Sequence, residues 1–178
     1  MRVLAGTYKS KKIETINSPD TRPMMSKVRE AIFNSIQFMI EEKDILDLYS
    51  CSVILVIEAL SRGDNYVKFV DFSKECIFIL KKNVENMSDN FSIVNSSVNS
   101  FIKNSINQYE LIFYDPPFEL DTEIVNEEIL IIEQILNNNG LLIIHRHKSS
   151  EEINFSKNYE LHKEKNYGQS KILILRRI

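Results

Sequence analysis

The arrangement of apolar segments from residue 44 onward restricts the fold more than any other feature of this sequence. Short apolar runs that predict buried strands occupy residues 45–49, 66–71, 91–95, 111–114 and 141–145. Between these runs, residues 54–61, 74–87, 98–105 and 123–137 have the apolar spacing of helices. Strands that alternate with helices build a parallel sheet that is covered on both faces. The predicted fold class is therefore α/β.

The end of the chain departs from this alternation. An Asn-rich stretch that leads to Gly140 predicts a helix stop ahead of the fifth strand. Residues 159–165 and 171–177 are joined through a turn that contains Gly168, and together they predict an antiparallel hairpin. The sheet should therefore carry an antiparallel addition at one edge.

The start of the chain predicts an extension of the same domain. Residues 27–40 have the pattern of an amphipathic helix, with Ser26 as its N-cap. Residues 2–16 predict a short strand pair or an extended arm that bends at Gly6. We therefore divide the chain into an N-terminal extension, residues 1–43, and a main α/β domain, residues 44–178.

Length and composition favour one soluble globular domain. A chain of 178 residues can bury a substantial core, and no apolar run approaches the roughly 20 residues that a membrane helix needs. The start lacks the apolar core and cleavage site of a secretion signal, so we expect a cytoplasmic protein. Cys51 and Cys76 match no zinc or redox spacing, which predicts two free thiols and no bound metal.

Charge excludes one broad class of partner-binding protein. A net charge of -3 argues against a general nucleic-acid coat protein, because nonspecific affinity for phosphates rises with positive charge. Basic residues still gather near both ends of the chain, and those near the start include Lys9, Lys11, Lys12, Arg22 and Arg29. They are either an RNA-binding surface or ordinary solvated charges, and Arg22 and Arg29 can instead form helix salt bridges.

The sharpest chemical feature is Asp115-Pro116-Pro117-Phe118, which directly follows a predicted strand. The carboxyl ends of strands are where α/β proteins place their functional sites. Consecutive prolines fix the backbone and remove two N–H donors, so the carbonyls of this turn are held rigidly as acceptors. A carboxylate beside such a carbonyl can accept both hydrogens of an exocyclic amine, and Phe118 can stack on the base. The alternative is a Pro-Pro pair that only ends a strand.

A strand followed by Asp-Pro-Pro-Phe resembles the amine-binding motif of methyltransferases that use S-adenosylmethionine. Further segments resemble bacterial 16S ribosomal RNA guanine-N2 methyltransferases, and together they cover nearly the whole chain: residues 21–23, 27–34, 58–63, 161–165 and 168–169. The resemblance implies a Rossmann-like, seven-stranded, mostly parallel sheet. It also implies that the last two strands form a hairpin and that the N-terminal extension helps to hold RNA.

The same resemblance implies roles for individual residues. Asp115 and the Pro116 carbonyl would bind the guanine amine, Pro117 would stiffen the turn, and Phe118 would hold a base flipped out of its helix. Asp71 would accept the ribose hydroxyls of the cofactor, and Ser97 stands where an adenine contact is usual. The full set of expected cofactor-binding residues is Asp47, Tyr49, Ser50, Cys51, Ser52, Asp71, Phe72, Ser97 and Val98.

The loop after the first strand departs from the family pattern. Glycines are expected at positions 51, 53 and 56, and this chain has Cys51, Val53 and Val56. A β-branched residue at positive φ costs on the order of 1 to 3 kcal/mol, so two such changes weaken cofactor binding by a factor of about 100 or more. The sequence therefore allows either a working enzyme with an altered loop or a protein that has lost catalysis.

The function that the sequence favours is methylation of a guanine N2 amino group in small-subunit ribosomal RNA, with S-adenosylmethionine as cofactor. The expected partner is 16S ribosomal RNA or the assembling small ribosomal subunit, and we expect a monomer without membrane association. One alternative is a catalytically impaired methyltransferase fold that acts as an RNA or ribosome-assembly binder. Another is an amino methyltransferase that acts on adenine N6 or on a protein glutamine.

Overall fold

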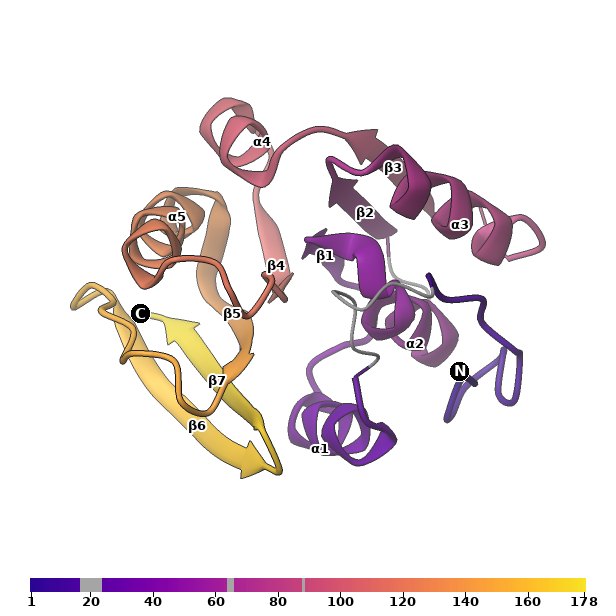
Figure 1. The fold of residues 1–178 in the computed structure, drawn as a ribbon, viewed down its shortest axis with the longest axis horizontal. Coiled ribbons are helices and arrows are strands. Elements are labelled where there is room, and N and C mark those ends of the chain that lie inside the picture. The colour runs from indigo at the N-terminus through magenta and orange to yellow at the C-terminus, as the bar shows by residue number, and fades with distance from the viewer. Residues whose placement is uncertain (17–23, 64–65, 88) are drawn as a thin grey trace.

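The structure, a computed structural model, describes residues 1–16, 24–63, 66–87 and 89–178 and contains one seven-stranded sheet (Figure 1). The strands lie in the order β3-β2-β1-β4-β5-β7-β6, and β7 runs antiparallel to both of its neighbours. The strands are β1 (Asp44–Leu48), β2 (Tyr66–Asp71), β3 (Phe91–Asn95), β4 (Tyr109–Tyr114), β5 (Leu136–His147), β6 (Tyr159–Tyr167) and β7 (Ser170–Arg177). The predicted α/β class and the hairpin are confirmed.

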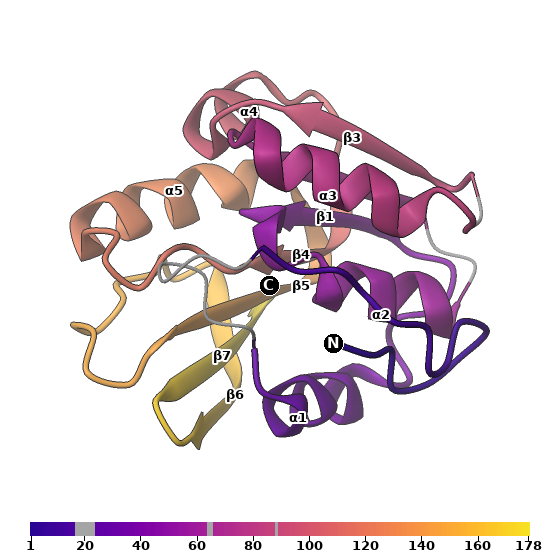
Figure 2. The same ribbon diagram turned by 45° about the vertical axis from the view of Figure 1, so that its right-hand side comes forward.

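Helices cover both faces of this sheet (Figures 1 and 2). One apolar cluster joins the sheet to the first three helices, and a second joins the opposite face to the last two. The helices are α1 (Ser26–Ile36), α2 (Ile54–Arg62), α3 (Lys74–Val84), α4 (Val98–Asn104) and α5 (Thr122–Ile135), with a short 3-10 turn, η1 (Ser50–Ser52), before α2. Among the residues described, no helix is both long and apolar enough to cross a membrane.

Three local predictions were wrong, two on where a helix begins or ends and one on the burial of a strand. The first helix ends at Ile36 instead of residue 40, and its N-cap is Met25, because the Ser26 hydroxyl contacts a guanidinium instead of the backbone. The helix stop predicted at Gly140 comes earlier, since α5 ends at Ile135 and the Asn-rich stretch already belongs to β5. The third strand was expected to be buried, but β3 lies at the sheet edge and is only partly covered.

The N-terminal arm is held on the domain by one buried acid. Glu58 of α2 is fully buried and accepts hydrogen bonds from the backbone N–H groups of Leu4 (2.8 Å) and Ala5 (2.9 Å). The arm turns at Gly6, where φ is +84°, and a single antiparallel bridge joins Arg2 to Lys12. A Cβ at position 6 would lie 1.6 Å from a carbonyl oxygen of α2, so only glycine fits this close approach.

Candidate functional site

The candidate site lies where the strand order reverses. The chain passes outward from β1 to β2 and β3, and β4 then returns to the other side of β1. Ligands of open α/β sheets bind at such a reversal, outside the carboxyl ends of the strands. The two strand ends are joined here, because the backbone N–H of Asp115 donates to the carbonyl of Leu48 over 3.4 Å. The predicted Asp115–Phe118 turn therefore stands at the reversal point.

Asp115 is held by a histidine from the neighbouring strand. Oδ1 of Asp115 lies 2.7 Å from Nδ1 of His145, near the end of β5. Nε2 of the same imidazole lies 2.8 Å from Oγ of Ser170, the first residue of β7. Asp115, His145 and Ser170 thus form one hydrogen-bonded chain across three strands of the sheet.

The rest of the turn is braced by β5. The ring of Phe118 packs edge-on against the imidazoles of His145 and His147, with centroids 5.1 and 5.5 Å apart. Buried Arg146 donates to the carbonyls of Pro117 (3.2 Å) and Leu120 (2.8 Å). Both ends of the proline turn are therefore fixed to one strand.

A buried acid ties the loop after β1 to β4. Glu128 of α5 accepts hydrogen bonds from the hydroxyls of Tyr114 (2.7 Å) and Tyr49 (2.9 Å). Burial raises the pKa of Glu128, and the two hydroxyls oppose that rise. Burial, and after it the charge of Glu128, raises the pKa of both tyrosines, so the hydroxyls remain donors at neutral pH. This hydrogen-bond network holds the Tyr49 hydroxyl on Glu128 of α5.

The acids predicted at the ends of β1 and β2 converge on the same edge. Asp47 and Asp71 are almost fully buried, and burial raises the pKa of each carboxyl. The charges of Asp115 and Asp71 add to the rise in the pKa of Asp47. At Asp71, the backbone N–H groups of Ser73 and Cys51 donate to the carboxyl and oppose the effect of burial. The structure therefore brings Asp47, Asp71 and Asp115 together.

The loop between β1 and α2 keeps a glycine-like path without glycines. Tyr49 (φ 64°) and Val53 (φ 43°) both adopt the left-handed conformation. The strain expected at Val53 is thus present, since a β-branched residue resists this region. The strain expected at Val56 was wrong, because this residue lies inside α2 without a positive φ. The side chains of Val53 and Val56 pack into the apolar cluster on the α1–α3 face. Ser50 stabilises the turn, because its Oγ donates to the carbonyl of Asp47 over 2.7 Å and accepts from the Val70 N–H.

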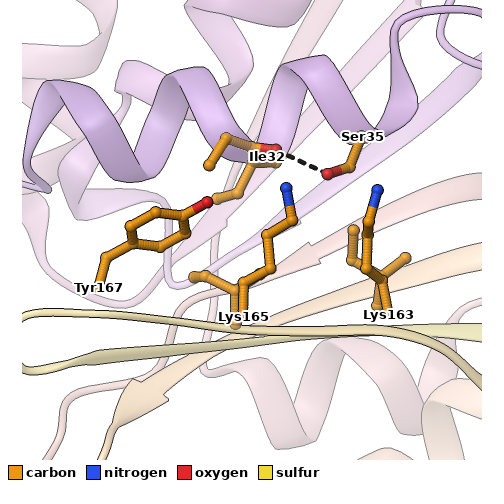
Figure 3. A pocket seen from close by; sticks show the side chains of 8 residues that line it. Ile32, Ser35, Lys163, Lys165 and Tyr167 are labelled. Atoms are coloured by element: carbon orange, nitrogen blue, oxygen red, sulfur yellow. Dashed lines mark hydrogen bonds between the residues drawn. The ribbon is translucent and has the colours of Figure 1, made fainter.

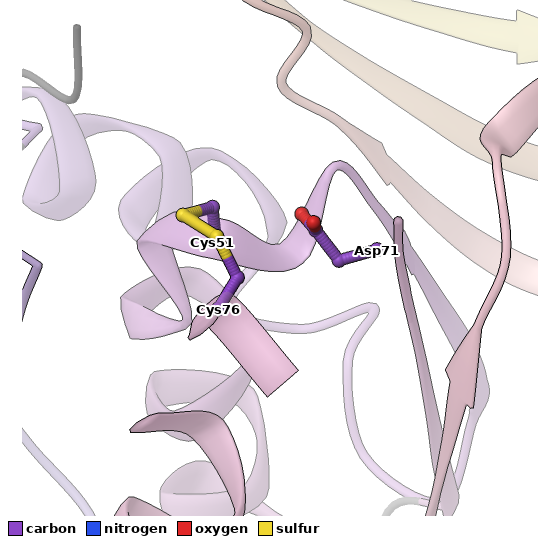
Figure 4. A group of neighbouring side chains, drawn as sticks. All are labelled: Cys51, Asp71 and Cys76. Carbon is purple, nitrogen blue, oxygen red and sulfur yellow. A yellow bond between two sulfur atoms is a disulfide. The ribbon is translucent and has the colours of Figure 1, made fainter. Parts of the chain in front are cut away.

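The prediction of two free thiols was wrong. Cys51 of η1 and Cys76 of α3 form a disulfide, because the loop after β1 passes directly over the first turn of α3 (Figure 4). The two cysteines and Asp71 are also close enough to share a metal ion, with their ligand atoms within 4.8 Å of one another. Both sulfurs are used by the disulfide, which fastens the loop beside Asp71.

The remaining predicted cofactor residues lie along the same edge. Phe72 is exposed directly after β2, and Ser52 belongs to the η1 turn. Exposed Ser97 is the N-cap of α4, where its Oγ accepts from the Ser100 N–H over 3.3 Å, and Val98 is buried below it. The Ser97 hydroxyl is therefore committed in part to its own helix.

The three predicted lysines lie on one segment of the chain. Lys9, Lys11 and Lys12 lie on the turn of the N-terminal arm, where Lys9 and Lys12 are exposed and the Lys11 ammonium stands 5.6 Å from the ring of Tyr8. Arg22 lies outside the residues that the structure describes.

The assignment of Arg29 to RNA binding was wrong. Its side chain is 2% exposed, lies 3.9 Å from Glu58 and donates to the carbonyl of Arg2. A cue was available in the sequence, because Arg29 stands three and four residues before Ile32 and Phe33 on the apolar side of the helix.

Sequence reasoning also missed His145, Arg146, Ser170 and Glu128. His145 and Arg146 had a usable signal, since they lie at the carboxyl end of an apolar strand, close to where Asp115 follows its own strand. Ser170 and Glu128 had none, because each meets its partner only through the sheet register or the packing of α5.

The strand order, together with an acid-proline turn at its reversal point, defines a class I methyltransferase. A family model described as Conserved hypothetical protein 95 matches residues 1–176. The chain belongs to this family.

Individual relatives agree along nearly the whole chain. Ribosomal RNA small subunit methyltransferase D of Haemophilus influenzae is 31% identical over 173 residues, which covers 94% of this chain and 89% of the relative. The Escherichia coli protein of the same name is 28% identical over 172 residues, covering 95% and 86%. The solved structure of Escherichia coli yhhF has a TM-score of 0.87 at 27% identity, covering 99% and 97%.

Proposed function

We propose that this protein methylates the N2 amino group of a guanine in small-subunit ribosomal RNA, with S-adenosylmethionine as the methyl donor. The observation that carries the proposal is the Asp115-Pro116 corner, fixed at the sheet's reversal point by His145 and Arg146. Membership of a family that includes ribosomal RNA small subunit methyltransferase D supports ribosomal RNA as the substrate class.

The corner acts by orienting and polarising a weakly basic amine. The Asp115 carboxylate and the Pro116 carbonyl each accept one N–H of the target, which turns the nitrogen lone pair outward. The target base must leave its stack to reach this corner, and Phe118 then packs on its face. No covalent intermediate with the protein is required, because positioning supplies most of the catalysis.

Residues along the carboxyl edge of β1 and β2 fit the proposed donor. Asp71 offers a buried carboxylate for the ribose hydroxyls, and the left-handed path of Tyr49 and Val53 leaves the loop backbone turned as a glycine loop would be. Ser97 and Val98 would border the adenine. When bound, the cofactor supplies an electrophilic methyl group, so that the N–C bond forms as the C–S bond breaks and S-adenosylhomocysteine leaves.

Two lysines of the β6–β7 hairpin are the residues that we expect to contact the RNA backbone. Lys163 and Lys165 are the charged residues that line a shallow depression between α1 and this hairpin (Figure 3). Both ammonium groups point from β6 toward α1, beside Tyr167. Lys165 is in register with Ile172, which is in register with His145, so two strand spacings, roughly 10 Å, separate this lysine from the histidine that contacts Asp115.

The double variant Lys163→Glu/Lys165→Glu should bind a 16S RNA fragment roughly tenfold or more weakly, because two phosphate contacts become repulsive. In a salt titration, the slope of log affinity against log salt should fall by about 2. Exposed Lys81 and Lys157 lie on other elements, and Lys81→Glu/Lys157→Glu is the control with the same charge change. Equal losses in both variants would show a nonspecific charge effect.

Calorimetric titration with S-adenosylhomocysteine, followed by a methylation assay on undermethylated small subunits, tests the whole proposal. We expect micromolar binding and N2-methylguanine in the digested RNA. If no heat of binding is detected up to millimolar S-adenosylhomocysteine, the protein is instead an RNA binder that has lost catalysis through its altered loop. Methylation of adenine N6 or of a protein glutamine would still agree with an amine-binding corner, but it would identify a different substrate.

A further inference from the structure

His145 is the central member of the chain Asp115–His145–Ser170, and the proposed mechanism has so far given it no part in the chemistry of methyl transfer. The side chains of His145 and Asp115 are 7% and 14% exposed, and Ser170 is buried. We propose that His145 is a positioning residue for methyl transfer, which holds the Asp115 carboxylate in the plane that the target amine requires. This inference rests on the proposed function and names a further residue of the same site.

The hydrogen-bonding capacity of the groups sets the direction of the first contact. An ionised Asp115 can only accept, so the imidazole nitrogen 2.7 Å away, Nδ1, carries the hydrogen. The Ser170 hydroxyl lies 2.8 Å from Nε2 and can either donate to this nitrogen or accept from it. Asp115 therefore selects a form of His145 with a hydrogen on Nδ1, and Ser170 anchors the opposite side of the ring.

The position of the three residues in the sheet makes this arrangement rigid. Ser170 is paired with His147 in the β5–β7 ladder, and His145 is paired with Ile172. Backbone pairing between the two strands therefore holds both Ser170 and His145 in place. Phe118 packs edge-on against the same imidazole. One histidine thus supports both the carboxylate that receives the amine and the ring that receives the base.

Positioning matters here because a carboxylate rotates easily, whereas amine attack needs an aligned lone pair. A displacement of about 1 Å at a reacting group can lower a rate roughly 10²-fold. Two carboxylate oxygens offer about four lone pairs, so a hydrogen bond at Oδ1 fixes the carboxylate plane and leaves acceptor capacity for an amine. After methylation the amine proton passes to Asp115, and His145 keeps its own hydrogen throughout.

The first test is steady-state kinetics of His145→Leu, which keeps an apolar contact for Phe118 and removes the donor. We expect kcat to fall roughly 10- to 100-fold while KM for RNA changes less than about threefold. His145→Asn places an N–H near Nδ1 and should restore most of kcat. Ser170→Ala should lower kcat by less than His145→Leu, because the ring loses one anchor and keeps its Nδ1 donor. Exposed His162→Leu on β6 is the matched control.

A second measurement does not depend on activity. In ¹⁵N-labelled protein, the Nδ1 proton of His145 should give a resonance shifted downfield by the Asp115 carboxylate, and Asp115→Asn should move it. Unchanged kcat in His145→Leu, an Asn variant no better than Leu, or a raised KM at constant kcat would each overturn the inference. An inactive parent protein would instead overturn the proposed function, so the two failures are separable.

Discussion

Replacement of Asp115 by asparagine should lower kcat for RNA methylation about 10³-fold, within the range that one oriented acceptor supplies to a transition state. The structure explains why an isosteric change is enough. The Nδ1–H of His145 demands an acceptor, so the new amide must turn its oxygen toward the imidazole. Its NH₂ group then faces the target amine, and two donors oppose each other.

RNA affinity and the midpoint of thermal unfolding should stay close to those of the parent protein, because the substitution keeps volume and the contact with His145. Glu119→Gln removes an exposed charge from the same turn and is the matched control, with an expected change in kcat below about twofold. If Asp115→Asn retains a third or more of the parent kcat, the acceptor for the amine must lie elsewhere.

The largest loss of stability should follow from Glu58→Ala. Glu58 is fully buried, accepts from Arg62 over 2.8 Å and lies 3.9 Å from Arg29, which is itself 2% exposed. Removal of the carboxylate leaves a buried guanidinium without its counter-charge, and it leaves the N–H groups of Leu4 and Ala5 without their acceptor. Breaking a buried pair in this way costs about 3–5 kcal/mol of the free energy of unfolding.

Urea unfolding monitored by circular dichroism measures this loss, and the N-terminal arm should become the first segment to exchange its amide hydrogens. Glu14→Ala is the control on the same arm. Its ion pair with Lys82 is about half exposed, with side chains at 47% and 53%, and its removal should cost at most about 1 kcal/mol. Equal losses in the two variants would mean that Glu58 does not hold the arm.

The alternation of strands and helices was sufficient to predict the fold, because apolar periodicity reports which face of each element is buried. Strands β2 and β3 begin and end where the pattern placed them. Element ends that depend on tertiary contacts were less accessible. The Asn-rich stretch before Gly140 looks like a helix stop, yet it belongs to β5, where it forms the irregular part between the Tyr109–Leu136 and Leu111–Leu141 pairs.

The candidate site was predictable where one segment carries its chemistry. Asp115, its two prolines and Phe118 are four consecutive residues that form a recognisable motif, and their roles in binding an amine and its base stay a prediction. His145 is 30 residues away in sequence, and its contact with Asp115 arises from strand register that no local pattern encodes. The Cys51–Cys76 disulfide was not predicted for the same reason, since the two cysteines are 25 residues apart and meet only through packing of η1 against α3.

The place of β7 between β5 and β6 sets the order in which the enzyme is completed during translation. Segments fold from the N-terminus as they emerge. Strands β1 to β5 can pair while later residues are still inside the exit tunnel, but Ser170 and the strand that lies against His145 arrive last. A nascent chain therefore lacks the contact of Ser170 with His145, beside Asp115, until β7 inserts next to β5.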